Sequence, residues 1–272
     1  YTLSLHDALP ILVIGLPRRW DAPFTDSDNW PRAVQIAWQL HDEWGTLIEH
    51  KDFLIKPDGF DVPYDAEKVH GISTQLAEAQ GVPIAEVFAA FNEALSKAQY
   101  VVGQNIGFDI NIMGAEFYRY GVESPLTEMP VIDTCTEATA NLCQIAGGKG
   151  GRYKLPTLTE LHSFLFGVPF AEAHNATADV EATTRCFFEL IRRGEGFQEG
   201  IFSKDYIKEF QAHHTSSIAL IGLKHVNLKE ASDALRKSSS NAQTTEPHAD
   251  TSLLEEAVFA DRKSTRLNSS HW

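Results

Sequence analysis

The sequence has few cysteines and no long apolar run, and each shortage excludes a class of protein. Its three cysteines, Cys135, Cys143 and Cys186, include no C-x-x-C pair, which argues against a disulfide framework and against a zinc site. They are typical of reduced thiols in a cytosolic core. No stretch reaches the roughly 18 consecutive apolar residues that a transmembrane helix needs. We therefore expect a cytoplasmic protein with no membrane partner.

Positive charge is also scarce. The 272 residues contain 23 Lys and Arg against 37 Asp and Glu, a formal net charge of −14. A protein this acidic does not bind nucleic acid through a broad basic surface. If its substrate is a polyanion, bound divalent metal is the obvious bridge between the two. A hydrophobic content of 43% with 22% charged residues is ordinary for a globular protein and excludes wholesale disorder.

The two ends of the chain differ in character from the rest. TLSLHDALPI at 2–11 and DRKSTRLNSSH at 261–271 resemble single-frame translations of the two common short-read sequencing adapters. We therefore expect residues 1–11 and 261–272 to be adapter-derived and exclude them from fold reasoning. The native insert expected between them lacks both natural termini.

Hydrophobic periodicity predicts an early hairpin followed by alternating helices and strands. The expected strands are 34–40, 47–55, 100–103 and 130–134, and the expected helices begin at Pro83, near Ile110 and at Thr157, with a last one that stops at Gly194. Residues 218–226 have the pattern of one more strand, and 237–252 are rich in Ser, Thr, Asn and Gln, as in a linker. This order predicts an α/β domain with a mixed sheet, followed by a tail.

Asp109 is the first residue with a chemical interpretation. It follows the strand expected at 100–103, in the run Asn105-Ile106-Gly107-Phe108-Asp109. A carboxylate between the end of a strand and the following helix projects into the crevice in which open α/β sheets bind their ligands. The position also suits a first-turn residue that only complements the helix dipole. Taken alone, this second interpretation is favoured.

His174 and Asp179 form a second candidate pair. Five residues separate their side chains by about 140° on an ideal helix, so they would not share a face. They can meet at one centre only if His174 lies on the preceding loop and Asp179 in the first turn, with Asn175 available as the cap. A surface histidine beside a helix-start aspartate is the alternative, and it is common.

Together these segments resemble two of the three motifs of the DEDDh-type 3′→5′ exonucleases, whose third motif is H-x-x-x-x-D. Gly15-Leu16-Pro17 resembles the end of the family's first motif, D-x-E-x-x-G-L, and the V-H-G-I run at 69–72 resembles its segment after the third strand. Leu155, Leu158 and Leu161 precede His174 as the family's leucine-rich helix does. The resemblance covers residues 15–194. DNWPRAVQIAWQLHDE and AHNATADVEATTRCF further resemble the epsilon-like proofreading exonuclease of bacterial DNA polymerase III, in the form fused to the alpha subunit.

The resemblance implies a ribonuclease H-like fold, with a central mixed β-sheet flanked by helices, plus an extended C-terminal tail. It implies an exonuclease domain over 12–195 with a truncated first strand, and a linker over 196–260 toward a missing module. The implied activity is metal-dependent 3′→5′ hydrolysis at DNA 3′ ends in replicative proofreading, which releases nucleoside 5′-monophosphates. The implied partners are a single-stranded DNA 3′ end and a replicative DNA polymerase, in cis or in trans. The alternatives are an RNA-trimming DEDDh exonuclease and a catalytically dead module that docks on nucleic acid or a polymerase.

The implied cofactors are two Mg²⁺ or Mn²⁺ ions, about 3.5–4 Å apart. Such hard cations prefer carboxylate oxygens. By resemblance, Asp179 binds the metal on the side of the nucleophile and Asp109 the metal on the side of the leaving group. His174 deprotonates the attacking water, as its unperturbed pKa near 6.5 suits a general base.

The substrate-binding residues implied by the resemblance are Gly15, Leu16, His70, Asn105 and Phe108. Gly15 and Leu16 are expected to contact the terminal nucleotide, with Leu16 wedged against its base. The other three are expected to line the single-strand groove, where aromatic stacking tolerates any base. For Phe108, simple core packing is an equally good interpretation.

The chain departs from the family at the first motif. Counting back from Gly15, the two carboxylates of D-x-E should stand at Pro10 and Leu12, and neither residue can ligate a metal. Pro10 should also break a main-chain hydrogen bond in a central strand. Asp7 lies three residues away, a shift that reverses its face. We expect the native gene to encode D-x-E here, so that this polypeptide lacks half of its carboxylates.

Overall fold

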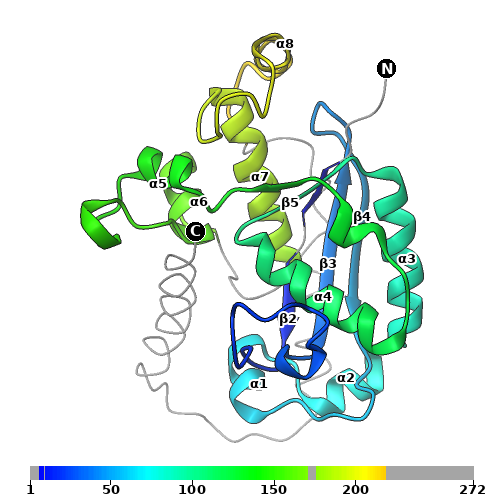
Figure 1. Ribbon diagram of the computed structural model, residues 1–272. Coiled ribbons are helices and arrows are strands. Elements are labelled where there is room, and N and C mark those ends of the chain that lie inside the picture. Colours follow the sequence, from blue (N-terminus) through cyan, green and yellow to red (C-terminus); the bar gives the residue numbers. More distant parts are fainter. Residues whose placement is uncertain (1–5, 9, 171–175, 219–272) are drawn as a thin grey trace, which may run out of the picture.

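The computed structural model describes residues 6–8, 10–170 and 176–218, which form a mixed sheet with helices on both faces (Figure 1). The strands are β1 His6–Ala8, β2 Ile11–Val13, β3 Ala33–His41, β4 Leu47–Leu54, β5 Tyr100–Gly103 and β6 Val131–Asp133. The α-helices are α1 Tyr64–His70, α2 Thr74–Gln80, α3 Ile84–Lys97, α4 Ile106–Tyr120, α5 Glu137–Cys143, α6 Leu158–Phe166, α7 Ala176–Arg193 and α8 Lys204–His213. Single 3₁₀ turns lie at η1 Ser27–Asn29, η2 Pro125–Glu128 and η3 Lys149–Gly151. None of the helices in these ranges has both the length and the apolar character needed to cross a membrane.

The sheet places β3 between β4 and the N-terminal strands. β3 is antiparallel to β1, β2 and β4, whereas β1, β5 and β6 run parallel to one another. β1 and β2 pair with β3 in one continuous register, with Ala8 opposite Gln39 and Ile11 opposite Ile36. Between them, the Ala37 amide donates to the Pro10 carbonyl at 3.3 Å. β1 and β2 therefore pair with β3 in the same register, and Pro10, directly before β2, has no amide proton to donate.

Part of the segment 1–11, which the sequence analysis left out of the fold, lies in the sheet. Residues 6–8 pair with both β3 and β5, and Ile11 lies in the main core. Strand pairing uses main-chain groups, so it constrains side chains much less than packing does. The segment can therefore complete the sheet whatever its origin.

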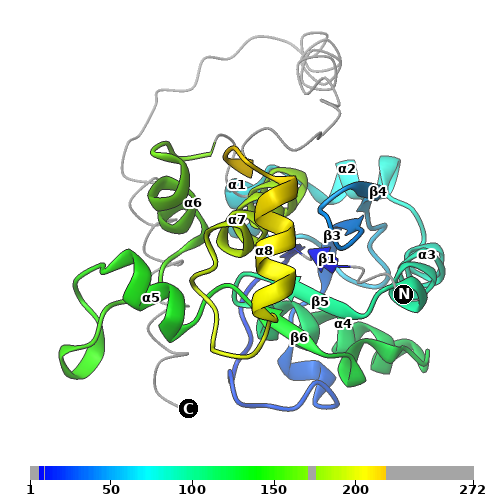
Figure 2. The same ribbon diagram turned by 90° about the horizontal axis from the view of Figure 1, so that it is seen from above.

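The two faces of the sheet carry different packing. On one face, Ile36 and Trp38 of β3 pack with Phe91 of α3 and Met113 of α4. On the other, Val102 and Ile132 pack against aromatic side chains of α7 and α8. Figure 2 views the molecule from above, with α7 and α8 on one side of the strands and α3 and α4 on the other. The predicted mixed sheet flanked by helices is confirmed.

Helix α8 lies within residues 196–260, the range expected to be a linker. Tyr206 and Phe210 occupy neighbouring positions on one face of the helix, and Phe210 stacks on Phe188 of α7 with ring centroids 5.8 Å apart. The Tyr206 hydroxyl donates to the Glu43 carbonyl in the β3–β4 turn at 2.7 Å. The prediction missed α8 because the surrounding glycines and polar residues hid a short amphipathic repeat. Residues 219–272, with the rest of the expected 218–226 strand and tail, lie outside the described residues.

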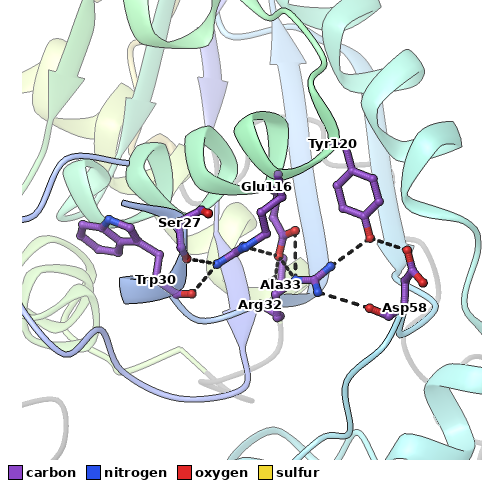
Figure 3. A network of polar contacts seen from close by, with 8 residues as sticks. Ser27, Trp30, Arg32, Ala33, Asp58, Glu116 and Tyr120 are labelled. Atoms are coloured by element: carbon purple, nitrogen blue, oxygen red, sulfur yellow. Dashed lines mark hydrogen bonds and ion pairs between the residues drawn. The ribbon is translucent and has the colours of Figure 1, made fainter. Parts of the chain in front are cut away.

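A buried carboxylate on α4 organises the polar contacts on one side of the molecule (Figure 3). The Glu116 side chain is fully buried, and it accepts hydrogen bonds from Nε of Arg32 at 3.0 and 3.2 Å and from the Ala33 amide at 2.9 Å. Arg119 forms an ion pair with the same carboxylate at 3.1 Å. It also donates to the carbonyl of Trp30 at 2.5 Å. Glu116 thus joins α4 both to the start of β3 and to the preceding loop.

A second buried carboxylate fixes the end of α7. The Glu189 side chain is fully buried and accepts hydrogen bonds from Arg192, Arg193 and the Ile218 amide. Burial alone would raise the pKa of the Glu189 carboxyl, but these donors outweigh it and lower the pKa to about 2. The ionised carboxylate therefore stabilises the fold.

We predict that Glu116→Gln lowers the free energy of unfolding by about 3 kcal/mol, because it leaves two largely buried guanidinium groups without their counter-charge. Urea denaturation at pH 7 measures this. The matched control is Glu93→Gln in the exposed ion pair with Lys97, where we expect almost no change. Equal effects of the two variants would contradict a special role for the Glu116 network.

For Glu189→Gln we predict a loss of about 2–3 kcal/mol at pH 7. A carboxyl with a lowered folded-state pKa contributes stability above its unfolded value of 4.5, and this contribution is lost as the pH falls toward 2. Urea titrations should therefore show that the difference in free energy of unfolding between the original chain and the variant falls to roughly half between pH 7 and pH 3. A difference that stays constant over this range would mean that the charge of Glu189 contributes nothing.

Candidate active site

The turn from β5 into α4 is tight, and it sets the position of Asp109. A Cβ atom at Gly103 would lie 2.5 Å from Cδ1 of Ile106, so only glycine fits this close approach. Asn105 then takes a left-handed conformation, with φ 58° and ψ 40°, as the N-cap of α4, which asparagine tolerates better than most residues. These two conformations place Asp109 in the first turn, at the C-terminal end of the parallel strands.

Asp133 at the end of β6 holds this turn in place. Its Oδ1 accepts hydrogen bonds from the amides of Asn105 at 2.8 Å and Cys135 at 2.7 Å. Burial raises the pKa of the Asp133 carboxyl to about 6 despite these hydrogen bonds. The sequence analysis assigned 130–134 only as a strand. The signal that could have found Asp133 was a carboxylate at the end of the strand next to the one that precedes Asp109.

Asp109 itself is deeply buried, with 8% of its surface exposed. Its Oδ1 accepts a hydrogen bond from the Ile11 amide at 2.9 Å, across 98 positions of the chain. Burial raises the pKa of the Asp109 carboxyl well above its usual range, and the negative charges of Asp133 and Asp179 raise it further. Asp109 is therefore more than a surface residue that complements the helix dipole.

Asp179 reaches this region from the opposite face of the sheet. It lies in the first turn of α7, where Ala176 and Val180 pack against Ala37 of β3. The small alanines allow the start of α7 to approach the sheet closely. The structure thus brings the carboxylates of Asp109 and Asp179 near enough to interact electrostatically. His174, the third residue of the predicted set, lies outside the described residues.

The first-motif positions lie between these two aspartates. Pro10 and Leu12 flank Ile11, whose amide binds Asp109, and Leu12 packs with the cluster of Ala176 and Val180. Position 12 is therefore next to the start of α7. Within the described residues, no group of three or more His, Cys, Asp or Glu side chains is arranged to hold a metal ion. A two-metal centre does not fit the described residues as they stand, because the side chains of Pro10 and Leu12 have no oxygen atom that could bind a metal.

The predicted substrate-binding residues lie just after β2, at the end of α1 and at the start of α4. Gly15 and Leu16 follow β2, and 55% of the Leu16 surface is exposed, as a residue that touches a ligand requires. Asn105 caps α4. Phe108 is partly buried, packs against the main core and lies 5.6 Å from the Trp20 ring. Core packing and a role in the groove are thus compatible for Phe108.

His70 has one ring nitrogen in a hydrogen bond and the other buried without a partner among the described residues. Its Nδ1 accepts a hydrogen bond from the Ile72 amide at 3.1 Å, which leaves the proton of the neutral ring on Nε2. Burial lowers the pKa of His70, so the ring is neutral at pH 7. Among the described residues, nothing accepts a hydrogen bond from Nε2, which is itself buried. Ile72 belongs to a cluster against which Leu12 packs, so this donor is near the first-motif positions.

Three comparisons place the chain among known proteins. A family model described as Exonuclease (RNase_T) matches residues 36–187, more than half of the chain. A DNA polymerase III of the PolC type from Pediococcus pentosaceus is 29% identical over 153 residues, which are 56% of this chain and 10% of that protein. The chain therefore spans about a tenth of the length of this curated relative.

Solved structures of Escherichia coli exonuclease I are also similar. The complex with a dT13 oligonucleotide has a TM-score of 0.54 at 22% identity, and the match covers 70% of this chain and 41% of that one. The complex with a dA16 oligonucleotide has a TM-score of 0.53 at 21% identity, and the match covers 78% of this chain and 44% of that one.

At these identities the solved structures support the fold, and they confirm the exonuclease type of α/β fold, which is ribonuclease H-like. The matched family segment runs from the middle of β3 into α7. It therefore contains both aspartates that the fold brings together. On this match, the chain belongs to the exonuclease family.

Proposed function

We propose that the chain is a DEDDh-type 3′→5′ exonuclease domain that removes nucleotides from DNA 3′ ends in replicative proofreading. The observation that carries the proposal is the approach of Asp109 and Asp179 from opposite faces of the sheet, beside the first-motif positions. Two of the similar solved structures hold single-stranded oligonucleotides. The PolC-type relative supports DNA over RNA and a replicative polymerase as the partner, in cis or in trans.

In this proposal each residue keeps the role that the resemblance gives it. Asp109 and Asp179 are the metal-binding carboxylates, and His174 is the base that takes the proton from the attacking water. Hydrolysis breaks the bond to the 3′ oxygen of the preceding nucleotide and releases a nucleoside 5′-monophosphate. Gly15, Leu16, His70, Asn105 and Phe108 hold the 3′ end of the strand.

The proposal assigns Mg²⁺ or Mn²⁺ only to a chain whose carboxylate set is complete. Asp109 suits a cation because it is buried and the charges of Asp133 and Asp179, which raise the pKa of its carboxyl, are both negative. Two further carboxylates are required where Pro10 and Leu12 stand. The polypeptide with Pro10 and Leu12 is thus an impaired nuclease, and docking on nucleic acid without cleavage is the second candidate function, favoured by these two residues.

We predict that the double variant Pro10→Asp with Leu12→Glu gains Mg²⁺-dependent trimming of a 5′-labelled DNA oligonucleotide from its 3′ end. The new carboxylates would stand on either side of Ile11, whose amide binds Asp109, and close to the start of α7, which carries Asp179. A ladder of products on a denaturing gel, absent in EDTA, is the expected result. An RNA oligonucleotide of the same sequence should be degraded much more slowly.

The matched control is Pro10→Asn with Leu12→Gln, which has similar shape but no negative charge, and it should stay inactive. Adding Asp109→Asn to the repaired chain should reduce the rate by about 100-fold or more, because loss of even an outer-shell partner of a metal ligand costs about 10- to 100-fold. If the repaired chain stays inert but binds single strands tightly, the docking module is the correct function. RNA degraded faster than DNA would favour the RNA-trimming alternative.

A second prediction concerns the Nε2 proton of His70. His70→Asn preserves an acceptor for the Ile72 amide but removes the Nε2 donor. Because the Ile72 hydrogen bond is kept, we expect unchanged thermal stability. The dissociation constant for a single-stranded oligonucleotide should rise about 3- to 10-fold, the value of one hydrogen bond. His70→Gln, which places an amide donor near the position of Nε2, is the paired variant and should bind better than His70→Asn. Equal binding by all three proteins would exclude contact between His70 and the strand.

A further inference from the structure

The β2–β3 loop, residues 14–32, is held firmly against α4. The buried Asn29 side chain accepts a hydrogen bond from the Arg19 amide at 2.7 Å and donates to the Arg19 carbonyl at 2.8 Å. The Arg18 amide donates to the Asn29 carbonyl at 3.2 Å. Phe24 packs so closely on α4 that a Cβ atom at Gly114 would lie 2.9 Å from its Cγ. In Figure 1 this loop is the dark blue segment beside β2 and α4. It therefore presents its side chains from a fixed backbone.

One of these side chains extends the candidate active site. The Trp20 ring lies 5.6 Å from the Phe108 ring at an interplanar angle of 37°, and the buried Trp30 supports Phe108 at 6.4 Å. Phe108 directly precedes Asp109 in the chain. Trp20 and Phe108 are both partly exposed. A partly exposed pair of aromatic rings thus lies at the start of α4, where Phe108 is the chain neighbour of Asp109.

The same loop has three arginines and three aspartates, a net charge of zero, and two of its arginines are adjacent in the chain. Arg18 and Arg19 are both exposed. Arg19 faces Asp26 at 3.3 Å, which offsets its charge. Within the described part of the chain, no carboxylate lies at ion-pair distance from Arg18. Arg18, two residues before Trp20, is thus an exposed arginine without an ion pair in the described part of a chain whose net charge is −14.

We propose that Arg18 and Trp20 form a binding subsite for a single-stranded polynucleotide as it leaves the catalytic crevice. A base stacks on the indole of Trp20, and the Arg18 guanidinium pairs with a backbone phosphate. The subsite is independent of sequence, because every base has an aromatic face. This inference rests on the proposed function, since it names the path of the strand that the same site would cleave. The matched family segment begins at residue 36, so the loop is a feature outside it.

The test measures binding of fluorescein-labelled dT12 by fluorescence anisotropy, once in EDTA, which prevents cleavage, and once with Ca²⁺. We expect Trp20→Ala to raise the dissociation constant about 5- to 50-fold, as loss of one stacked base does. Trp20→Phe, which keeps an aromatic face, should restore most of the affinity. In the original chain, binding of the oligonucleotide should quench the fluorescence of Trp20. Trp20→Phe should lose this part of the total quenching.

Arg18 is tested through the salt dependence of binding. One phosphate contact contributes about 0.7 to the slope of log affinity against log salt for a single strand, so Arg18→Gln should reduce the slope by about that amount. Arg19→Gln is the matched control: it removes the same charge one residue away, from a guanidinium that already faces Asp26. A general electrostatic effect would lower the salt slope of both variants equally. A local phosphate contact would lower mainly the slope of Arg18→Gln.

The outcomes separate the two proposals. If the original chain binds dT12 and the Trp20 and Arg18 variants bind equally well, the subsite is wrong and the proposed function stands. If the original chain binds no single strand in either buffer, both the proposed function and the subsite are overturned. Should Trp20→Ala unfold, as thermal melting would show, Trp20→Phe and the Arg18→Gln salt slope decide the question.

Discussion

Two buried carboxylates on α4 hold the centre of the molecule together. Asp109 and Glu116 stand seven residues apart, about two helical turns, so they share one face of the helix. Each accepts a main-chain amide from the strand pair beneath it, Asp109 from Ile11 and Glu116 from Ala33. These contacts fix the distance and the rotation of α4 relative to the sheet. The position of the whole candidate site follows from them.

The two carboxylates differ in what neutralises them. Glu116 has two arginines around it and is a structural anion. Among the described residues, no lysine or arginine forms an ion pair with Asp109, whose charged neighbours are Asp133 and Asp179. A buried carboxylate without a counter-charge is costly unless it is protonated or meets a cation. The same helix thus carries one carboxylate that two arginines neutralise and one for which we propose a role in metal binding.

The sequence predicted the parts that depend on local pattern and on motif spacing. Alternation located the β3–β4 hairpin, and the capping box of Thr157 and Glu160 marked the start of α6. The motif around Asp109 and Asp179 led to two residues that the fold brings together, although their roles remain proposals. Pro10 marked the interruption of the first strand, because proline cannot donate in a sheet.

The contacts that the sequence did not reveal join residues far apart in the chain. Glu116 lies within an amphipathic helix, and the neighbouring sequence does not predict its buried ion pair with Arg32, 84 positions away. Asp133 supports a helix to which it does not belong, and α8 is stabilised by aromatic side chains of α7. Such contacts need the tertiary fold before they can be recognised.

The packing of α8 also determines where the chain can be tethered. The Ile218 amide is bound by Glu189, ten residues and about 15 Å further along α7 than Asp179. The polypeptide therefore continues from a point well behind the carboxylates and not beside them. A bulky domain joined there would be attached near the end of α7 that is remote from Asp179. A force on that domain would reach Asp179 along α7 and not through the β2–β3 loop.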